Sequence, residues 1–313
     1  MTSAGGADSL RRPRFSQAAT FYGLPRESTE SIDVAFIGVP FDGGVTFRPG
    51  ARHGPEAIRA ATKLIRRVHH LSLVSPFDVL QCVDAGDAPI EHWFDLEKAH
   101  ADIGRFYESL PTSTIPITFG GDHSISIPIL RSLGGVRPVA VIHIDAHCDT
   151  SGEYGGSRFH HGSPFRIAAE EGLIIPKLTY QLGIRGSLAN AEQWSYSYDS
   201  GMTVMTIEDL YKRDIEIIGQ SIVADIGDIP VYLSFDIDAI DPVFAPGTGT
   251  PEVGGLTSLE ALKLIRALAG ANLIGADIVE VSPPFDQGGH TSLLAATLGF
   301  EILCIIAASR LAQ

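Results

Sequence analysis

Residues 142–149 read Ile142-His143-Ile144-Asp145-Ala146-His147-Cys148-Asp149 and complete an apolar run that starts at Val139. Asp145, His147 and Asp149 occupy alternate positions, so a strand that ends here presents all three side chains on one side. Carboxylates and imidazoles are both common metal ligands. The stretch therefore predicts a buried strand that brings three metal-capable side chains to one edge of a sheet.

Two other segments repeat this pattern of an apolar run that ends in acids or histidine. His123 follows the run 115–119 within Gly-Gly-Asp-His-Ser, and Asp236 and Asp238 follow the run 231–235. Taken alone, each motif is typical of a turn, a helix cap or a hydrogen-bonded core histidine. Ligand sites of open α/β sheets lie at the carboxyl ends of parallel strands, so the three strand ends together predict one metal site.

The rest of the chain alternates short apolar runs with helix-like segments, which is typical of a parallel sheet covered on both faces. Strands are predicted at 34–39, 79–83, 115–119, 139–144, 178–184, 203–206, 231–235 and 273–279. The clearest helices are predicted at 55–66, 95–110, 258–269 with Ser258 as the N-cap, and 291–308. We find no internal repeat, so we expect one domain over 13–313, preceded by a flexible tail over residues 1–12.

Composition narrows the classes of partner. The 313 residues are 44% hydrophobic and carry a formal net charge of -14, which argues against binding to nucleic acid or to an anionic membrane. No apolar run of membrane-spanning length and no signal-like segment is evident. Three cysteines form no disulfide framework, so we expect a reducing, cytoplasmic location.

The donor set predicts the chemistry of the site. The candidate metal ligands are His123, Asp145, His147, Asp149, Asp236 and Asp238. Oxygen donors are in the majority, which suits Mn²⁺, while Ni²⁺, Co²⁺, Zn²⁺ and Fe²⁺ stay open because affinity alone does not select the ion. Six ligands suit two ions about 3.5 to 4 Å apart, which lower the pKa of a shared water and supply hydroxide as the nucleophile. Cys148 lies between two candidate ligands and is expected to point away from them, in a structural role.

These three motifs resemble those of the ureohydrolase superfamily, the arginases, agmatinases and guanidino-acid hydrolases. The similarity extends along nearly the whole chain, through segments 48–52, 160–165, 246–252 and 280–284, and is greatest to the agmatinase and guanidinobutyrase branch. It implies a three-layer α/β/α sandwich with a central, mainly parallel eight-stranded sheet. It also implies two Mn²⁺ ions per subunit, release of urea from a small cationic guanidino substrate such as agmatine or 4-guanidinobutyrate, and a homotrimer or homohexamer.

The resemblance also assigns roles to individual residues. His123, Asp145, Asp149 and Asp236 hold one ion, and Asp145, His147, Asp236 and Asp238 hold the other, with Asp145 and Asp236 as bridges. His161 matches the histidine that moves a proton, Glu280 matches the acid that pairs with the guanidinium, and Asp238 also relays the proton. A carboxylate and a histidine suit these tasks, since a guanidinium is planar and cationic and the leaving amine needs a proton.

The far end of the substrate is predicted from loops 150–159 and 187–199. Glu153 suits a distal ammonium, Arg158 suits a distal carboxylate, and His160 is a third candidate for substrate contact. Three positions depart from the branch pattern, namely Gly23, His53 and His290, and they leave a non-standard substrate open: free guanidine, a biguanide or a proclavaminate-type intermediate.

Two functions from other classes also stay open. A phosphoesterase also uses two metals among Asp and His, although no basic phosphate clamp accompanies these motifs. A non-catalytic partner subunit keeps the fold but loses ligands, and here all six are present.

Overall fold

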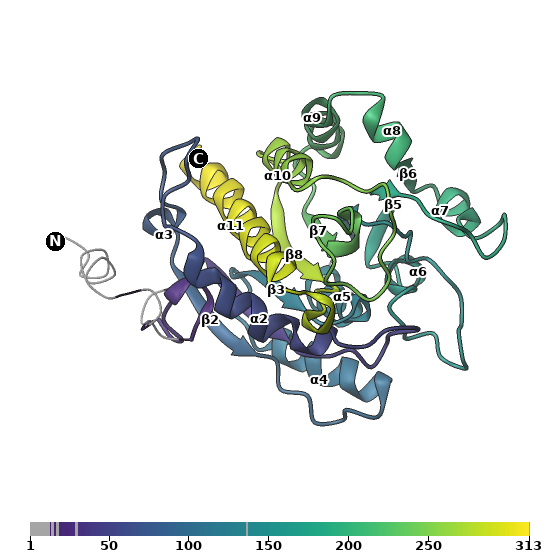
Figure 1. Ribbon diagram of the computed structural model, residues 1–313, viewed down its shortest axis with the longest axis horizontal. Coiled ribbons are helices and arrows are strands. Elements are labelled where there is room, and N and C mark those ends of the chain that lie inside the picture. The colour runs from purple at the N-terminus through teal and green to yellow at the C-terminus, as the bar shows by residue number, and fades with distance from the viewer. Residues whose placement is uncertain (1–12, 14–15, 17–18, 29–30, 136, 313) are drawn as a thin grey trace.

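Eight parallel strands form the centre of the protein (Figure 1). The computed structural model describes residues 13, 16, 19–28, 31–135 and 137–312. The strands lie in the order β2-β1-β3-β8-β7-β4-β5-β6, and every described pairing is parallel. Their bounds are β1 Val34–Val39, β2 Cys82–Asp87, β3 Ile115–Gly120, β4 Val139–Ile144, β5 Ile174–Ile184, β6 Thr203–Thr206, β7 Val231–Asp236 and β8 Leu273–Val279. The predicted α/β class with an eight-stranded parallel sheet is confirmed.

Helices cover both faces of this sheet. One layer contains α2 Gly54–Ala61, α3 Pro76–Val79, α8 Ile207–Tyr211, α9 Ile215–Ile226, α10 Ser258–Ala267 and α11 His290–Leu311. The other contains α4 Leu96–Glu108, α5 Ser126–Gly134 and α6 Pro164–Glu170, with α7 Ser195–Ser200 beside α6. Single 3₁₀ turns are η2 Phe21–Gly23, η3 Ala51–His53, η4 Thr62–Leu64, η5 His123–Ile125, η6 Ile237–Ala239 and η7 Pro283–Phe285.

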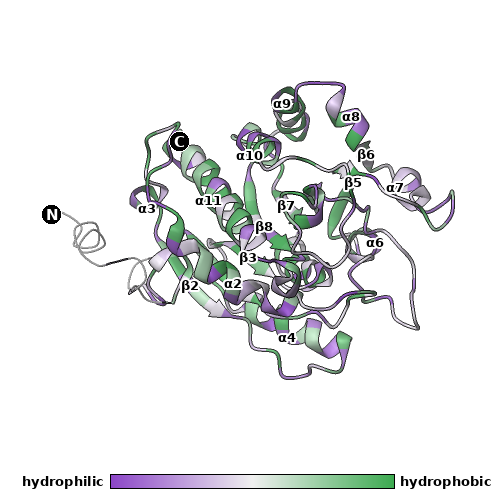
Figure 2. Ribbon diagram, in the orientation of Figure 1, coloured by the Kyte–Doolittle hydropathy of each residue, from purple (hydrophilic) through white to green (hydrophobic). Residues whose placement is uncertain are grey.

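The core follows from strand alternation. In β1, Val34 and Phe36 pack with the first layer, whereas Ala35, Ile37 and Val39 pack with the second. Both faces of the strand are therefore apolar, as a sheet covered on two sides requires. Hydrophobic residues accordingly concentrate on the strands and the inner helix faces (Figure 2).

Several predicted boundaries were wrong: β5 begins at Ile174 instead of residue 178, α2 ends at Ala61 instead of residue 66, and two others have a clear local cause. Residues 76–79 form α3 instead of the start of a strand, because Pro76 suits the first turn of a helix, and the strand begins only at Cys82, which pairs with Val34. The N-cap of α10 is Thr257 instead of Ser258, since the Thr257 side chain accepts from the Glu260 N–H in a capping box.

Helix α11 is long and apolar enough, by length and composition, to cross a membrane. However, 72% of its most apolar window is buried inside the protein, and it packs against α2, α3, α10 and β8. Its apolarity is therefore that of a core helix in the first layer. The expected tail over residues 1–12 lies outside the described residues, and the single domain over 13–313 stays a prediction, although the described part builds one sheet.

Candidate active site

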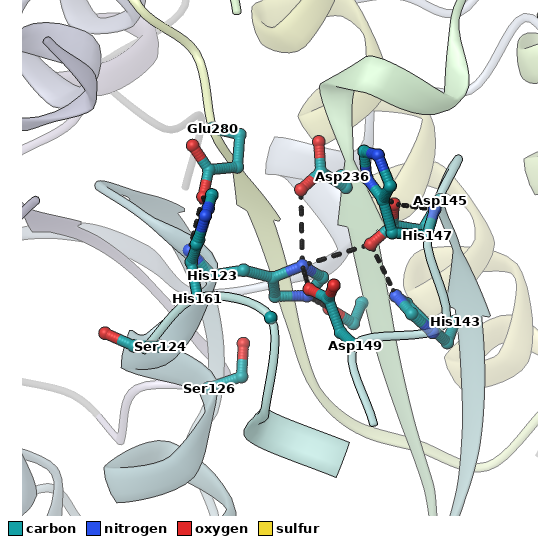
Figure 3. A network of polar contacts seen from close by, with 12 residues as sticks. His123, Ser124, Ser126, His143, Asp145, His147, Asp149, His161, Asp236 and Glu280 are labelled. Carbon is teal, nitrogen blue, oxygen red and sulfur yellow. Dashed lines mark hydrogen bonds and ion pairs between the residues drawn. The ribbon is translucent and has the colours of Figure 1, made fainter. Parts of the chain in front are cut away.

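Four neighbouring strands end at one place on the edge of the sheet. β3, β8, β7 and β4 are adjacent in the sheet order, and their carboxyl ends carry the three predicted motifs together with Glu280 (Figure 3). Parallel pairing aligns these ends, so residues more than a hundred positions apart become neighbours. The structure thus brings together all six predicted ligands.

His123 is the centre of one group of donors. Its Nδ1 lies 2.9 Å from Asp149 Oδ2 and 3.2 Å from both Asp145 Oδ2 and Asp236 Oδ2. This fully buried nitrogen makes no hydrogen bond, while Nε2 lies 2.8 Å from Ser234 Oγ. A ring nitrogen directed at three carboxylate oxygens without a hydrogen bond fits coordination of a cation.

A second group adjoins the first and shares Asp145 with it. His147 Nδ1 lies 3.4 Å from Asp145 Oδ1 and 3.2 Å from Asp238 Oδ2. These three residues offer ligand atoms that lie within 4.8 Å of one another. Two cations that share Asp145 therefore fit the donor set, whereas a bridging role for Asp236 stays a prediction.

The cluster concentrates negative charge in a buried place. Burial, and then repulsion from Asp238 and Asp145, raises the pKa of Asp236 well above its ordinary value. Burial also raises the pKa of Asp238. In Asp145, by contrast, the neighbouring histidines outweigh burial and hold the pKa well below its usual range. Divalent cations between these carboxylates offset the repulsion, which is a second reason why the residues fit a metal.

Glu280 and His161 lie beside this cluster. Glu280 Oε1 accepts from the His123 N–H and from His161 Nδ1, both at 2.9 Å. On its other side, His161 Nε2 lies 2.7 Å from Thr46 Oγ1. Burial lowers the pKa of the His161 imidazole, but the Glu280, Asp149 and Asp122 carboxylates together outweigh it and raise the pKa to about 9. The predicted proton-moving histidine and guanidinium-binding acid are thus in contact.

Two site residues have strained backbones. Asp149 has a φ of 50° and Glu280 a φ of 63°, the left-handed region that side chains other than glycine rarely adopt. Among the described residues only Tyr22 and Leu73 share this feature. Such strain persists where the surrounding structure fixes it, and it occurs often at functional sites.

The sequence and the fold are similar to those of known proteins. A family model described as Arginase family matches residues 32–304. The chain belongs to the arginase family. A guanidinopropionase of Pseudomonas aeruginosa is 45% identical over 96% of each chain. A mitochondrial agmatinase of Gallus gallus is 42% identical over 89% of this chain and 82% of its own. The solved structure of proclavaminate amidinohydrolase from Streptomyces clavuligerus matches with a TM-score of 0.91 at 40% identity, over 95% of this chain and all of the other.

Of the three candidates for substrate contact in this arginase-family protein, two line a cavity and one does not. A cavity of about 320 Å³ opens from the cluster, and Glu153 and His160 line it. Arg158 does not line it and instead pairs with Glu170 at 2.7 Å. His160 is buried, and both of its ring nitrogens contact backbone, Nε2 at 2.8 Å from Gly152 O and Nδ1 at 3.2 Å from Gly162 N. It fixes the loop, and its contacts leave no ring nitrogen directed at a ligand.

Sequence reasoning missed His143, although it lies in the very stretch that decides the fold. The buried His143 Nε2 is 2.7 Å from Asp145 Oδ2, so it orients a carboxylate shared by both groups. Gln181 in turn contacts His143 Nδ1 at 3.2 Å. The available signal was alternation, because His143 shares the side of Asp145 on the same strand.

The three departures from the branch pattern lie away from the cavity. Gly23 ends η2 with a φ of 70°, His53 ends η3, and His290 begins α11. All three are exposed, and none lines the cavity.

Proposed function

We propose that this protein hydrolyses the guanidino group of a small linear guanidino compound to an amine and urea, with two divalent cations as cofactor. One observation carries the proposal: two adjoining groups of carboxylates and histidines share Asp145 at the end of a cavity, beside the buried acid Glu280. The residues that hold the cations are His123, Asp145, His147, Asp149, Asp236 and Asp238. When bound, the cations activate a water as the nucleophile and offset the charge of the acids.

Glu280 binds the guanidinium head. Its Oε1 already accepts two hydrogen bonds, whereas Oε2 faces the side of Gly249, where an added Cβ would lie 3.7 Å away. Among the described residues no hydrogen bond reaches Oε2, so this oxygen can accept from the guanidinium. A carboxylate against a guanidinium forms a directional, charge-assisted pair that orients the central carbon.

His161 supplies the proton that the leaving amine requires. The water oxygen bonds to the guanidino carbon, the bond from that carbon to the substituted nitrogen breaks, and the nitrogen departs as an amine once it is protonated. His161 is held between Glu280 and Thr46, so its ring has one defined orientation at the cavity wall. Asp238 relays the proton from the water, since its carboxylate belongs to the second donor group.

We further propose Mn²⁺ as the ion, a cytoplasmic location and a homotrimer or homohexamer. The majority of oxygen donors favours Mn²⁺, with Ni²⁺, Co²⁺ or Zn²⁺ as alternatives. The three cysteines are unpaired, which suits a reducing compartment. Trp93 and the fully exposed Phe94 form apolar surface of the kind that subunit contacts cover. Metal analysis, cell fractionation and light scattering test these points separately.

The test of the activity is urea release by metal-loaded protein. We expect urea from at least one member of a panel of agmatine, 4-guanidinobutyrate, 3-guanidinopropionate, arginine and free guanidine, with Mn²⁺ or Ni²⁺ loaded. An aryl phosphate serves as the control for phosphoesterase activity. Metal-loaded protein that releases no urea from any guanidino compound contradicts the proposal, and phosphate release without urea favours the phosphoesterase alternative.

A further inference from the structure

The cavity has two ends of different character. Its inner end is the donor cluster, with Asp149 and Asp236, together with His161. Its outer end is formed by loop 150–154 and by Gln193 and Trp194, which precede α7. A guanidino compound bound with its head at the cluster therefore extends its other end toward these loops.

Glu153 is the one charged side chain at the outer end. Among the described residues that line the cavity there is no lysine or arginine. Glu153 is exposed, and the structure gives its carboxylate neither a hydrogen bond nor an ion pair within the described part of the chain. Tyr154 and Trp194 also line the cavity. A cation suits both features, since it pairs with a carboxylate and is attracted to ring faces.

Arg158 and Arg166, the two arginines near loop 150–154, both pair with Glu170. Arg158 Nη2 lies 2.7 Å from Glu170 Oε2, and Arg166 Nε lies 2.9 Å from Glu170 Oε1. The Arg166 guanidinium also lies over the Tyr196 ring at 4.5 Å. Both oxygens of one carboxylate thus hold two arginines, and neither arginine lines the cavity. Arg166 Nη1 comes close to the wall at Gly152, 3.4 Å from where an added Cβ would lie, but the charge of Arg166 is paired with Glu170.

Charge balance leads to the same result. The four aspartates of the cluster carry four negative charges, which two divalent cations neutralise. Glu280 is then paired by the guanidinium head. Glu153 remains as the uncompensated charge of the outer end, so it attracts a cationic group and repels an anionic one.

His160 keeps this arrangement in place. Its Nε2 contacts Gly152 O at 2.8 Å, and Ser151 N–H donates to Gly162 O at 2.8 Å. Two further backbone hydrogen bonds join Tyr154 and Ser157. The loop is therefore tied on both sides of Glu153, and the carboxylate is presented at the cavity rim by bonded backbone.

We propose that the outer end of the cavity selects guanidino compounds whose far end carries a second positive charge, and that Glu153 is the residue that makes this selection. The inference rests on the proposed function and names the substrate class of the same site. The names of the relatives do not decide it, because they include both a guanidinopropionase and an agmatinase.

The test uses three substrates that each carry a chain of four carbons and differ in the group at its far end. These are agmatine with an ammonium, butylguanidine with a neutral tail, and 4-guanidinobutyrate with a carboxylate. For the metal-loaded protein we expect kcat/KM to fall in that order, by about tenfold at each step, the effect of one charge-assisted contact. In Glu153→Gln the preference for agmatine over butylguanidine is lost.

Two further variants make the result specific. Glu192→Gln removes the same charge from an exposed position that does not line the cavity, and it leaves all three ratios as in wild type. Arg158→Gln likewise leaves them unchanged, because its guanidinium pairs with Glu170 and does not line the cavity. A wild-type preference for 4-guanidinobutyrate that Arg158→Gln abolishes overturns the inference but leaves the proposed function standing. Absence of urea from all three substrates overturns both.

Discussion

The inner and outer ends of the cavity are built by different means. At the inner end, strands β3, β8, β7 and β4 fix the side chains, and His123, Asp145 and Asp238 are almost fully buried, each with close polar neighbours. At the outer end, loop residues such as Glu153 and Tyr154 are exposed. On the proposed function, the strand ends hold the reacting groups and the loops select the substrate. Substitutions at the inner end should therefore reduce turnover or metal binding, whereas substitutions at the outer end should change the preference between substrates.

The largest effect is expected for Asp236→Ala. Removing one carboxylate from the donor cluster should abolish urea release and the stabilisation by metal, which for wild type is about 2.7 kcal/mol at a metal concentration of 100 Kd. The unfolding free energy without metal should change little, because the loss of the repulsion that raises the pKa of Asp236 offsets the loss of the hydrogen bond from the Asp238 N–H to its carboxylate. Thermal unfolding with and without Mn²⁺ measures both.

Asp228→Ala is the matched control, since Asp228 is exposed and lies just before β7, at the opposite end of the same strand. It should keep activity and metal stabilisation. Near-normal turnover in Asp236→Ala would refute the assignment of the inner end as the metal centre.

A smaller effect is expected for His161→Asn, which separates proton transfer from metal binding. kcat should fall by about 100- to 10,000-fold, the usual contribution of a general acid or base, whereas metal affinity should be unchanged because His161 is not among the predicted ligands. Steady-state kinetics with each substrate and a metal titration give the two numbers. His290→Asn, at an exposed histidine outside the cavity, should change neither. Weaker metal binding in His161→Asn would instead make it a ligand.

His143→Gln tests whether His143, which is not a predicted ligand, positions the carboxylate of Asp145. His143 orients Asp145 through a 2.7 Å contact, so its loss should weaken metal affinity or activity by about 10- to 100-fold, as is usual for groups that orient a ligand. His100→Gln removes an equally buried histidine that contacts Ser124 Oγ at 3.0 Å. It controls for general destabilisation, and equal metal affinities in the two variants would deny His143 a positioning role.

The same contrast explains what the sequence could predict. The strand ends were predictable because Asp145, His147 and Asp149 alternate directly after a buried strand, and parallel pairing then brings this strand end beside those that carry His123 and Asp236. Glu280 was assigned only through the family resemblance, since a single acid after a strand carries little signal. The loop was not predictable, because the pairing of Arg158 with Glu170 depends on the position of α6, which no local pattern encodes. His143 alternates with Asp145 in the sequence, but its second partner, Gln181, is evident only from the register of β4 and β5.

The smallest effect within the inner end is expected for Cys148→Ala. Cys148 lies between two predicted ligands, yet burial raises the pKa of its thiol to about 12, so at neutral pH it is protonated and a poor nucleophile. We expect kcat/KM to stay near wild type and the unfolding free energy to fall by about 1 kcal/mol, the cost of removing one small buried group. Cys82→Ala, at a buried thiol on β2 whose pKa is also about 12, should lose similar stability with no change in activity. If Cys148→Ala alone abolished turnover while it still bound metal, the thiol would take part in the reaction, and the inner end would contain chemistry beyond its acids and histidines.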